Sequence, residues 1–261
     1  MNGTMWRVDF NEAGNGSSRY ANGLFTTQNN RPITSAPALA ANPNGGMMVY
    51  FGTGKLIETV DRLQSGIELE TMYAIRDRER DVPFTQLGNP EISIVDGQRT
   101  IIGETGPLGW ALRLSPSTVA TGERVLARPR VIFGQVIFTT FEPEDDPCAP
   151  GGGQRVYVIN ALTGAGELDN ICPNCAVVEL GIGAPVDPAV VIVPPSDPDF
   201  GGGGGDPTDP DPDPDVDPPG DDSAGAANRW CPILSAITDA TTGPIGLRPI
   251  CEGRQIWRQV R

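Results

Sequence analysis

Histidine is absent from the 261-residue sequence, and lysine occurs only once, as Lys55. Without histidine there is no Ser/His or Cys/His nucleophile pair, no imidazole base and none of the commonest zinc ligand. No apolar run approaches the ~20 residues of a membrane-spanning helix. We therefore expect a protein that is not an enzyme, has no membrane span, and carries no catalytic, cofactor-binding or metal-binding residue.

Positive charge is also scarce, because 19 Lys and Arg residues stand against 33 Asp and Glu residues, for a net charge of −14. An acidic chain repels the phosphate backbone of nucleic acids and the surface of anionic membranes, so we expect neither as a partner. Much of the acidic excess lies between Asp206 and Asp222, which leaves the rest of the chain closer to neutral.

A segment with almost no apolar residues, 194–227, interrupts the chain. It contains five consecutive glycines and a run from Asp209 to Asp217 in which Asp alternates mainly with Pro. Calcium loops use a similar alternation of carboxylates, but they also need a sharp turn, whereas alternate prolines hold an extended path along which side chains diverge. We expect a disordered, solvated insertion here, whose deletion barely changes the melting temperature.

Turn-forming residues are abundant, with 33 glycines and 26 prolines. Between them, short runs such as 4–10 and 71–77 alternate apolar and polar residues, whereas 47–52 is continuously apolar, as in a strand buried on both faces. No long stretch has helical periodicity, so the sequence predicts an all-β protein with antiparallel strands. Further expected strands are 92–95, 100–102, 110–114, 128–133, 136–141, 155–160 and 189–193, with 33–39 at best an edge strand because of its prolines.

A weak internal repeat favours a β-propeller among the all-β folds. Residues 48–54, 71–77 and 156–164 each combine an aromatic strand with a polar turn at Asp, Asn or Gly. Quinoprotein-like propeller blades share this form. We expect blades over residues 1–193, the insertion over 194–227, and a C-terminal segment, 228–261, that completes a partial propeller.

Five cysteines favour an oxidising compartment. They are Cys148, Cys172, Cys175, Cys231 and Cys251. The C-x-x-C pair at 172 and 175 lacks both the βαβ context of a redox site and the second half of a zinc site. We expect structural disulfides instead: Cys231 with Cys251, which closes a loop of about twenty residues, and Cys148 with Cys172 or Cys175.

Two further sets of side chains invite a functional interpretation that the sequence does not favour. The tryptophans are scattered over strand-like runs, so we expect packing in the core or between blades rather than a sugar-binding platform. They are Trp6, Trp110, Trp230 and Trp257. Five acidic residues resemble the carboxylates of a glycosidase, but their spacing gives no reason to converge, and we expect them on the surface. They are Glu68, Glu70, Asp77, Glu79 and Asp81.

Short motifs follow one another along the whole chain, apart from the acidic insertion. In order they are NGTMWRVD (2–9), PITSAP (32–37), VYFGTGK (49–55), Asp61, MYAIRD (72–77), GWALRL (109–114), GERV (122–125), VIFTT (136–140), DPC (146–148) and GRQIWRQV (253–260). Each motif alone is weak, but the ordered series resembles the PilY-like family of type IV pilus assembly and tip adhesin proteins.

The resemblance implies the C-terminal part of a β-propeller at the pilus tip, with a structural and adhesive role that supports pilus biogenesis, surface attachment and twitching motility. Its implied partners are minor pilins and host or abiotic surfaces, after export through the periplasm to the cell surface. The family's calcium loop usually precedes the strand that resembles 2–9. We therefore expect that loop, and a signal peptide, upstream of Met1 of a fragment or truncated gene product, and no cofactor in this chain.

The alternative is a fragment of a PQQ-dependent quinoprotein-type dehydrogenase, whose blades look similar. Recognisable ligands for that cofactor are missing from the sequence.

Overall fold

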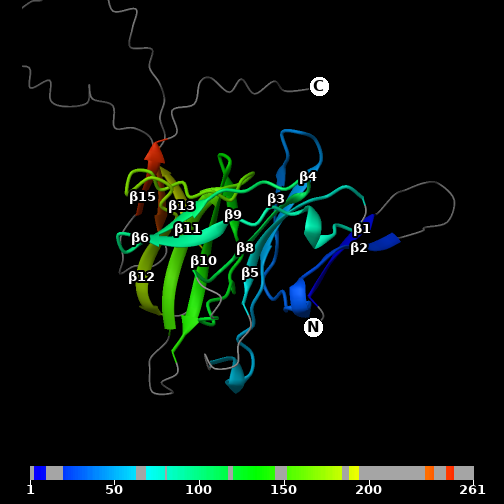
Figure 1. The fold of residues 1–261 in the computed structure, drawn as a ribbon, viewed down its shortest axis with the longest axis horizontal. Helices are drawn as coiled ribbons and strands as arrows, with labels where there is room; N and C mark the ends of the chain where they lie inside the picture. Colours follow the sequence, from blue (N-terminus) through cyan, green and yellow to red (C-terminus); the bar gives the residue numbers. More distant parts are fainter. Residues whose placement is uncertain are drawn as a thin grey trace, which may run out of the picture.

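The computed structural model describes residues 3–9, 20–62, 69–79, 81–116, 120–144, 152–183, 188–193, 233–237 and 245–249 (Figure 1). Within these ranges the regular structure consists of strands β1 to β15 and three short 3-10 helices, η1 (Gln28–Asn30), η2 (Thr59–Arg62) and η3 (Phe84–Gln86). The expected all-β class is confirmed. No helix in the described ranges is long and apolar enough to cross a membrane.

Two four-stranded antiparallel sheets form the centre of the molecule. The β4 sheet has the order β3-β4-β5-β8, and the β10 sheet has the order β12-β11-β10-β9. The strands of the β4 sheet are β3 (Ala38–Ala41), β4 (Met47–Gly52), β5 (Thr71–Arg76) and β8 (Gly109–Arg113). Those of the β10 sheet are β9 (Arg130–Ile132), β10 (Gln135–Pro143), β11 (Gly152–Asn160) and β12 (Val177–Gly183).

Three smaller antiparallel units complete the described part of the chain. They are the ribbon of β1 (Thr4–Asp9) and β2 (Tyr20–Thr26), the hairpin of β6 (Glu91–Val95) and β7 (Gln98–Ile102), and the sheet of β13 (Ala189–Val193), β14 (Ile233–Ile237) and β15 (Ile245–Pro249). The expected insertion at 194–227 lies outside the described residues.

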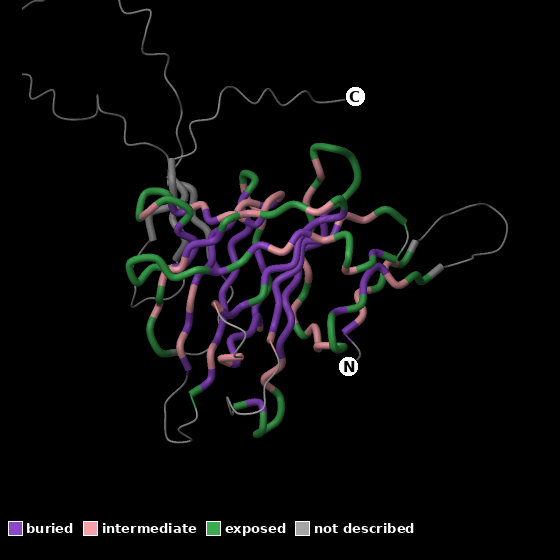
Figure 2. The backbone as a smooth tube through the Cα atoms, viewed as in Figure 1, coloured by how far each residue is buried: buried purple, intermediate pink, exposed green. Residues whose placement is uncertain are grey.

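Alternation along β4 places two separate cores on the two faces of its sheet. Because successive side chains of a strand point to opposite faces, Met48 and Tyr50 join one buried cluster while Val49 and Phe51 join another. The expectation that 47–52 is buried on both faces is therefore confirmed. Figure 2 shows the buried residues concentrated along the central strands.

The cluster that contains Tyr50 lies between the two large sheets. Trp110 of β8 belongs to it, together with Phe138 of β10 and Tyr157 of β11. The indole Nε1 of Trp110 donates a hydrogen bond of 3.0 Å to the carbonyl of Ala161, so its one polar atom is satisfied inside the core.

The tryptophans do not all lie in the core. Trp110 is fully buried, as expected, but Trp6 on β1 is 61% exposed, so the expectation is wrong for this residue. The β1–β2 ribbon covers the β4 sheet through Leu24 and Phe25 of β2, and the alternation of β1 turns Trp6 away. Trp230 and Trp257 lie outside the described residues.

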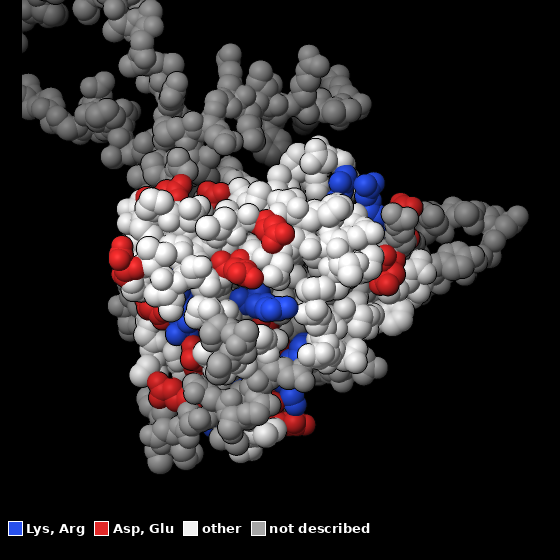
Figure 3. Space-filling model, in the orientation of Figure 1, with Lys and Arg blue, Asp and Glu red and all other residues white. Residues whose placement is uncertain are grey.

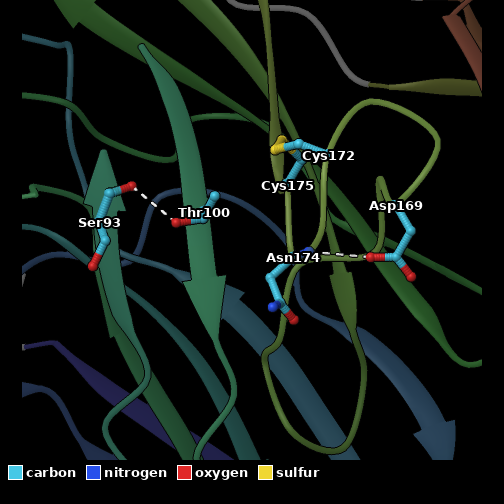
Figure 4. Close-up of a disulfide and its surroundings, with 6 residues drawn as sticks. All are labelled: Ser93, Thr100, Asp169, Cys172, Asn174 and Cys175. Carbon is cyan, nitrogen blue, oxygen red and sulfur yellow. Dashed lines mark hydrogen bonds between the residues drawn. A yellow bond between two sulfur atoms is a disulfide. The ribbon is translucent and has the colours of Figure 1, made fainter. Parts of the chain in front are cut away.

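A loop that contains Cys172 and Cys175 joins the β6–β7 hairpin to the β10 sheet. Its backbone pairs with β7: Ile101 N–H donates to the carbonyl of Asn174 (3.0 Å), and Ala176 N–H donates to the carbonyl of Arg99 (3.1 Å). The loop also covers the outer face of the β10 sheet with Cys175, which is 1% exposed. Figure 4 shows this loop beside the hairpin, with Asn174 N–H donating to the carboxylate of Asp169.

The disulfide pattern differs from the expected one. Cys172 is bonded to Cys175, with Cα atoms 5.2 Å apart, so the expected bond from Cys148 to either of them is wrong. A tight turn brings the two sulfurs together, since Cys175 N–H donates to the carbonyl of Cys172 (3.0 Å). Cys148, Cys231 and Cys251 lie outside the described residues, and the expected pair between the last two remains a prediction.

The double variant Cys172→Ala, Cys175→Ala should lower the free energy of unfolding by about 2 kcal/mol, because the closed loop is short and constrains the unfolded chain little. Urea denaturation of the variant and the wild type would measure this. Peptide mapping under non-reducing conditions should find the two cysteines in one linked peptide. A link from Cys148 to Cys172 would contradict the assignment.

Candidate functional site

The motif GERV, residues 122–125, joins the β4 sheet to the β10 sheet. Arg124 forms an antiparallel bridge with Phe141 at the end of β10, through two backbone hydrogen bonds of 2.9 Å. Val125 N–H donates to the carbonyl of Thr53, just after β4 (3.0 Å). The packing requires glycine at position 52, because a Cβ there would lie 2.3 Å from the Cβ of Val125.

Glu123 is the centre of a buried ionic network on one side of this segment. Its side chain is fully buried and receives two guanidinium groups at Oε2, Arg99 at 2.7 Å and Arg155 at 3.2 Å. Its other oxygen, Oε1, accepts hydrogen bonds of 2.7 Å from the hydroxyls of Tyr157 and Thr140. These four donors come from β7, β10 and β11, so a single carboxylate connects the hairpin to the β10 sheet.

The protonation states in this network are fixed by its surroundings. Burial, reinforced by the Glu123 carboxylate, raises the pKa of the Tyr157 hydroxyl well above its usual value, so the hydroxyl stays a hydrogen-bond donor. Burial alone would lower the pKa of Arg155, but Glu123, Glu179 and Glu142 outweigh it and raise the pKa above the ordinary value. The Tyr157 hydroxyl therefore stays protonated and the Arg155 guanidinium stays charged near neutral pH.

Arg124 extends to the other side of the segment, into the loop that follows VYFGTGK. Its Nη1 donates to the backbone carbonyls of Lys55 (2.7 Å) and Asp61 (2.8 Å), and its Nε donates to the carbonyl of Gly122 (2.8 Å). Burial lowers the pKa of this guanidinium, with Glu70 and Asp61 opposing the shift. Three separate motifs of the sequence, GERV, the end of VYFGTGK and Asp61, thus meet at one arginine.

Asp61 closes that loop. Its Oδ2 accepts backbone N–H groups of Ile57 (2.9 Å) and Glu58 (2.8 Å), and its Oδ1 lies 3.2 Å from the ammonium of Lys55. Burial alone would raise the pKa of Asp61, but the two backbone donors and Lys55 outweigh it and lower the pKa. Asp61 is therefore ionised at neutral pH and stabilises the loop as an anion.

The five acidic residues considered as glycosidase carboxylates do not form a site. Glu70 is buried, so the surface expectation is wrong for it; Arg31 pairs with its Oε1, which compensates the buried charge, while Oε2 has no hydrogen-bond partner in the described ranges. Asp77 is partly buried and pairs with Arg7 at 3.1 Å. Glu79 and Asp81 are exposed, as expected, and Glu68 lies outside the described residues.

The arrangement is suited to holding strands together rather than to catalysis. The Glu123 carboxylate is neutralised by arginines, and the one lysine has its pKa raised by hydrogen bonds to Glu58 and Asp61, so it is a charged donor and not a base or nucleophile. In the described ranges, no group of three Cys, Asp or Glu side chains is placed to hold a metal ion. Figure 3 shows charges of both signs on the face in view, without a basic patch.

Comparisons with known proteins agree with the fold and with the motif series. No family model matches the sequence. The type IV pilus biogenesis factor PilY1 of Pseudomonas aeruginosa strain PAO1 is 30% identical over 162 residues, which are 51% of this chain and 14% of that protein. A PilY1 homolog of Xylella fastidiosa is 27% identical over 200 residues, 66% of this chain and 13% of that protein.

The fold also has a solved counterpart. The crystal structure of the Pseudomonas aeruginosa PilY1 C-terminal domain superposes with a TM-score of 0.59 at 15% identity, over 95% of this chain and 56% of that one. The sequence matches, together with the shared fold, support a PilY-like family member.

The chain is therefore similar to PilY1 proteins, as the order of its motifs indicated. It spans about a seventh of the length of the curated relatives it matches. Sequence reasoning identified GERV only as a motif of that series. It did not foresee that Glu123 binds Arg99, Arg155 and Tyr157, because only the folded sheets bring these partners near it.

Proposed function

We propose that this PilY-like chain is a rigid structural part of a type IV pilus biogenesis factor and not an enzyme. The observation that supports the proposal best is the similarity to PilY1 proteins in both sequence and fold. The site adds a physical reason: its charges are paired and buried, which favours a stable scaffold over a reaction centre.

The finer role follows from the family. In this proposal the two four-stranded sheets are blades of a propeller at the pilus tip, where it contacts minor pilins and supports biogenesis, surface attachment and twitching motility. The protein is exported through the periplasm to the cell surface. The loops of such a platform bind surfaces while the sheets stay fixed.

Genetics in the bacterium that encodes the chain would test the proposal. Deletion of the gene should remove most pilin from the sheared surface fraction and abolish twitching, and a plasmid copy should restore both. A copy with the exposed change Glu179→Gln should restore them equally well. Normal surface pili in the deletion strain would contradict the proposal.

The dehydrogenase alternative has a separate test. Purified protein incubated with PQQ and calcium should show no alcohol-dependent dye reduction. Activity that requires both additions would replace the scaffold proposal with an enzymatic one.

A further inference from the structure

One edge of the β6–β7 hairpin pairs with no strand in the described ranges. Its turn, Asp96-Gly97, has φ values of +49° and +78°, and Val95 pairs with Gln98 across it. In a two-residue turn of this kind the flanking pair is hydrogen bonded, so the peptide groups of every second residue point outward. On β7 these outward groups belong to Arg99 and Ile101. Both form backbone hydrogen bonds with the loop that contains Cys172 and Cys175.

On β6 the outward peptide groups belong to Ile92 and Ile94. Neither residue forms a hydrogen bond outside its own hairpin to any part of the described chain. The Ile94 side chain is 60% exposed and that of Val95 is 51% exposed, so the edge is apolar as well as unpaired. An exposed apolar edge with free N–H and C=O groups is a template for another strand.

A surface pocket of about 160 Å³ lies at the start of this edge. Residues 89–92 line one side, and Arg113, Ser115 and Pro116 line the other. The chain before β6 runs parallel to β8, with Ala111 N–H donating to the carbonyl of Gly88 (2.9 Å), and the pocket forms where the two strands diverge. The peptide groups of every second residue in an extended chain point to the same side. The outward N–H and C=O groups of Ile92 and Ile94 therefore face the side on which Gly88 binds β8.

The pocket presents an unpaired cation. Arg113 is exposed, and its guanidinium has no hydrogen bond or ion pair with any residue in the described ranges. Glu91 also lines the pocket and is likewise without a charged partner there. An incoming group beside Arg113 should be an anion, because a guanidinium binds carboxylates best.

We propose that the β6 edge and its pocket bind an extended segment of a partner protein, which adds a strand to β6 and places an acidic side chain against Arg113. Antiparallel pairing, the more stable orientation, puts that side chain near the C-terminal end of the segment. The inference depends on the β6 edge and on the pocket beside Arg113, and it holds whether or not the protein acts on a pilus.

Selection from a phage-displayed library of random ten-residue peptides against the whole chain would test this. The selected peptides should alternate apolar residues and carry Asp or Glu near their C-terminal end. Ile94→Pro should weaken the best synthetic peptide about tenfold in fluorescence anisotropy, since it removes one outward N–H while leaving the ladder to β7 intact. Ile94→Val, the matched control, should bind like the wild type.

The charge requires its own pair of variants. Arg113→Gln should weaken binding about threefold, and Glu91→Gln should strengthen it slightly. In the Arg113→Gln variant, replacing the acidic residue of the peptide by its amide should not weaken peptide binding further. Amide exchange at Ile92 and Ile94 should slow when the peptide is bound, which tests the edge even if Ile94→Pro does not fold.

Three results would overturn the proposal. The first is a failure to select any peptide, and the second is selected peptides that bind folded Ile94→Pro as tightly as the wild type. The third is a wild-type dimer in sedimentation that Ile94→Pro converts to a monomer, which would assign the edge to a second copy of the chain.

Discussion

Replacing Glu123 by alanine should lower the free energy of unfolding by about 3–5 kcal/mol. The change leaves two guanidinium groups, those of Arg99 and Arg155, close together beneath the sheets without the carboxylate that neutralises them. It also removes the acceptor for the Tyr157 hydroxyl, and an unsatisfied buried hydroxyl adds to the cost. The melting temperature should fall by roughly 10 °C or more.

Glu179→Gln is the matched control for this change. Glu179 also binds Arg155, at 2.8 Å, but the Glu179 side chain is 62% exposed. Its loss should therefore cost less than about 1 kcal/mol of stability. Urea denaturation followed by intrinsic fluorescence would measure both variants. If the two variants lost similar amounts of stability, the network around Glu123 would not be a main support of the fold.

Replacing Trp110 by alanine should cost about 3–5 kcal/mol as well, for a different reason. The indole is fully buried between the two large sheets and donates to the carbonyl of Ala161, so its removal leaves a large cavity and takes away one of the two hydrogen bonds to that carbonyl. Its neighbour Tyr50, 6.4 Å away between ring centroids, cannot fill that space without leaving its own hydrogen bond to Ala161.

Trp6→Ala provides the same chemical change at an exposed position. Because Trp6 is 61% exposed, we expect its replacement to alter stability by no more than about 0.5 kcal/mol. Thermal unfolding by circular dichroism would compare the two tryptophan variants directly. A larger loss for Trp6→Ala than for Trp110→Ala would mean that the assignment of the core is wrong.

Much of the fold could be predicted from local patterns. The continuous apolar run at 47–52 became β4, and the turn Asp96-Gly97 became a tight hairpin because both positions require positive φ. Strands β5, β8, β10 and β11 also coincide closely with expected runs, because each contains a run of apolar residues that the fold buries. The family was also accessible, since the order of motifs is a property of the sequence alone.

Four described strands, β2, β12, β14 and β15, were not predicted, and the sequences of the first two show why. The ribbon strand β2 contains Asn22 and Gly23, and β12 contains Gly181, where the pairing with β11 is irregular. Such residues read as turns in the sequence, and only pairing with a neighbouring strand makes them extended.

The sequence by itself determined the all-β class, the central strands, the exclusion of histidine chemistry and the family, because each depends on composition, local periodicity or motif order. Only the tertiary structure decided which charges are paired. Glu123 is 24 residues from Arg99 and 34 from Tyr157 along the chain, so their contact depends on how the hairpin crosses the sheets. The same holds for the burial of Glu70, the exposure of Trp6 and the free edge of β6, since burial is set by what other segments cover.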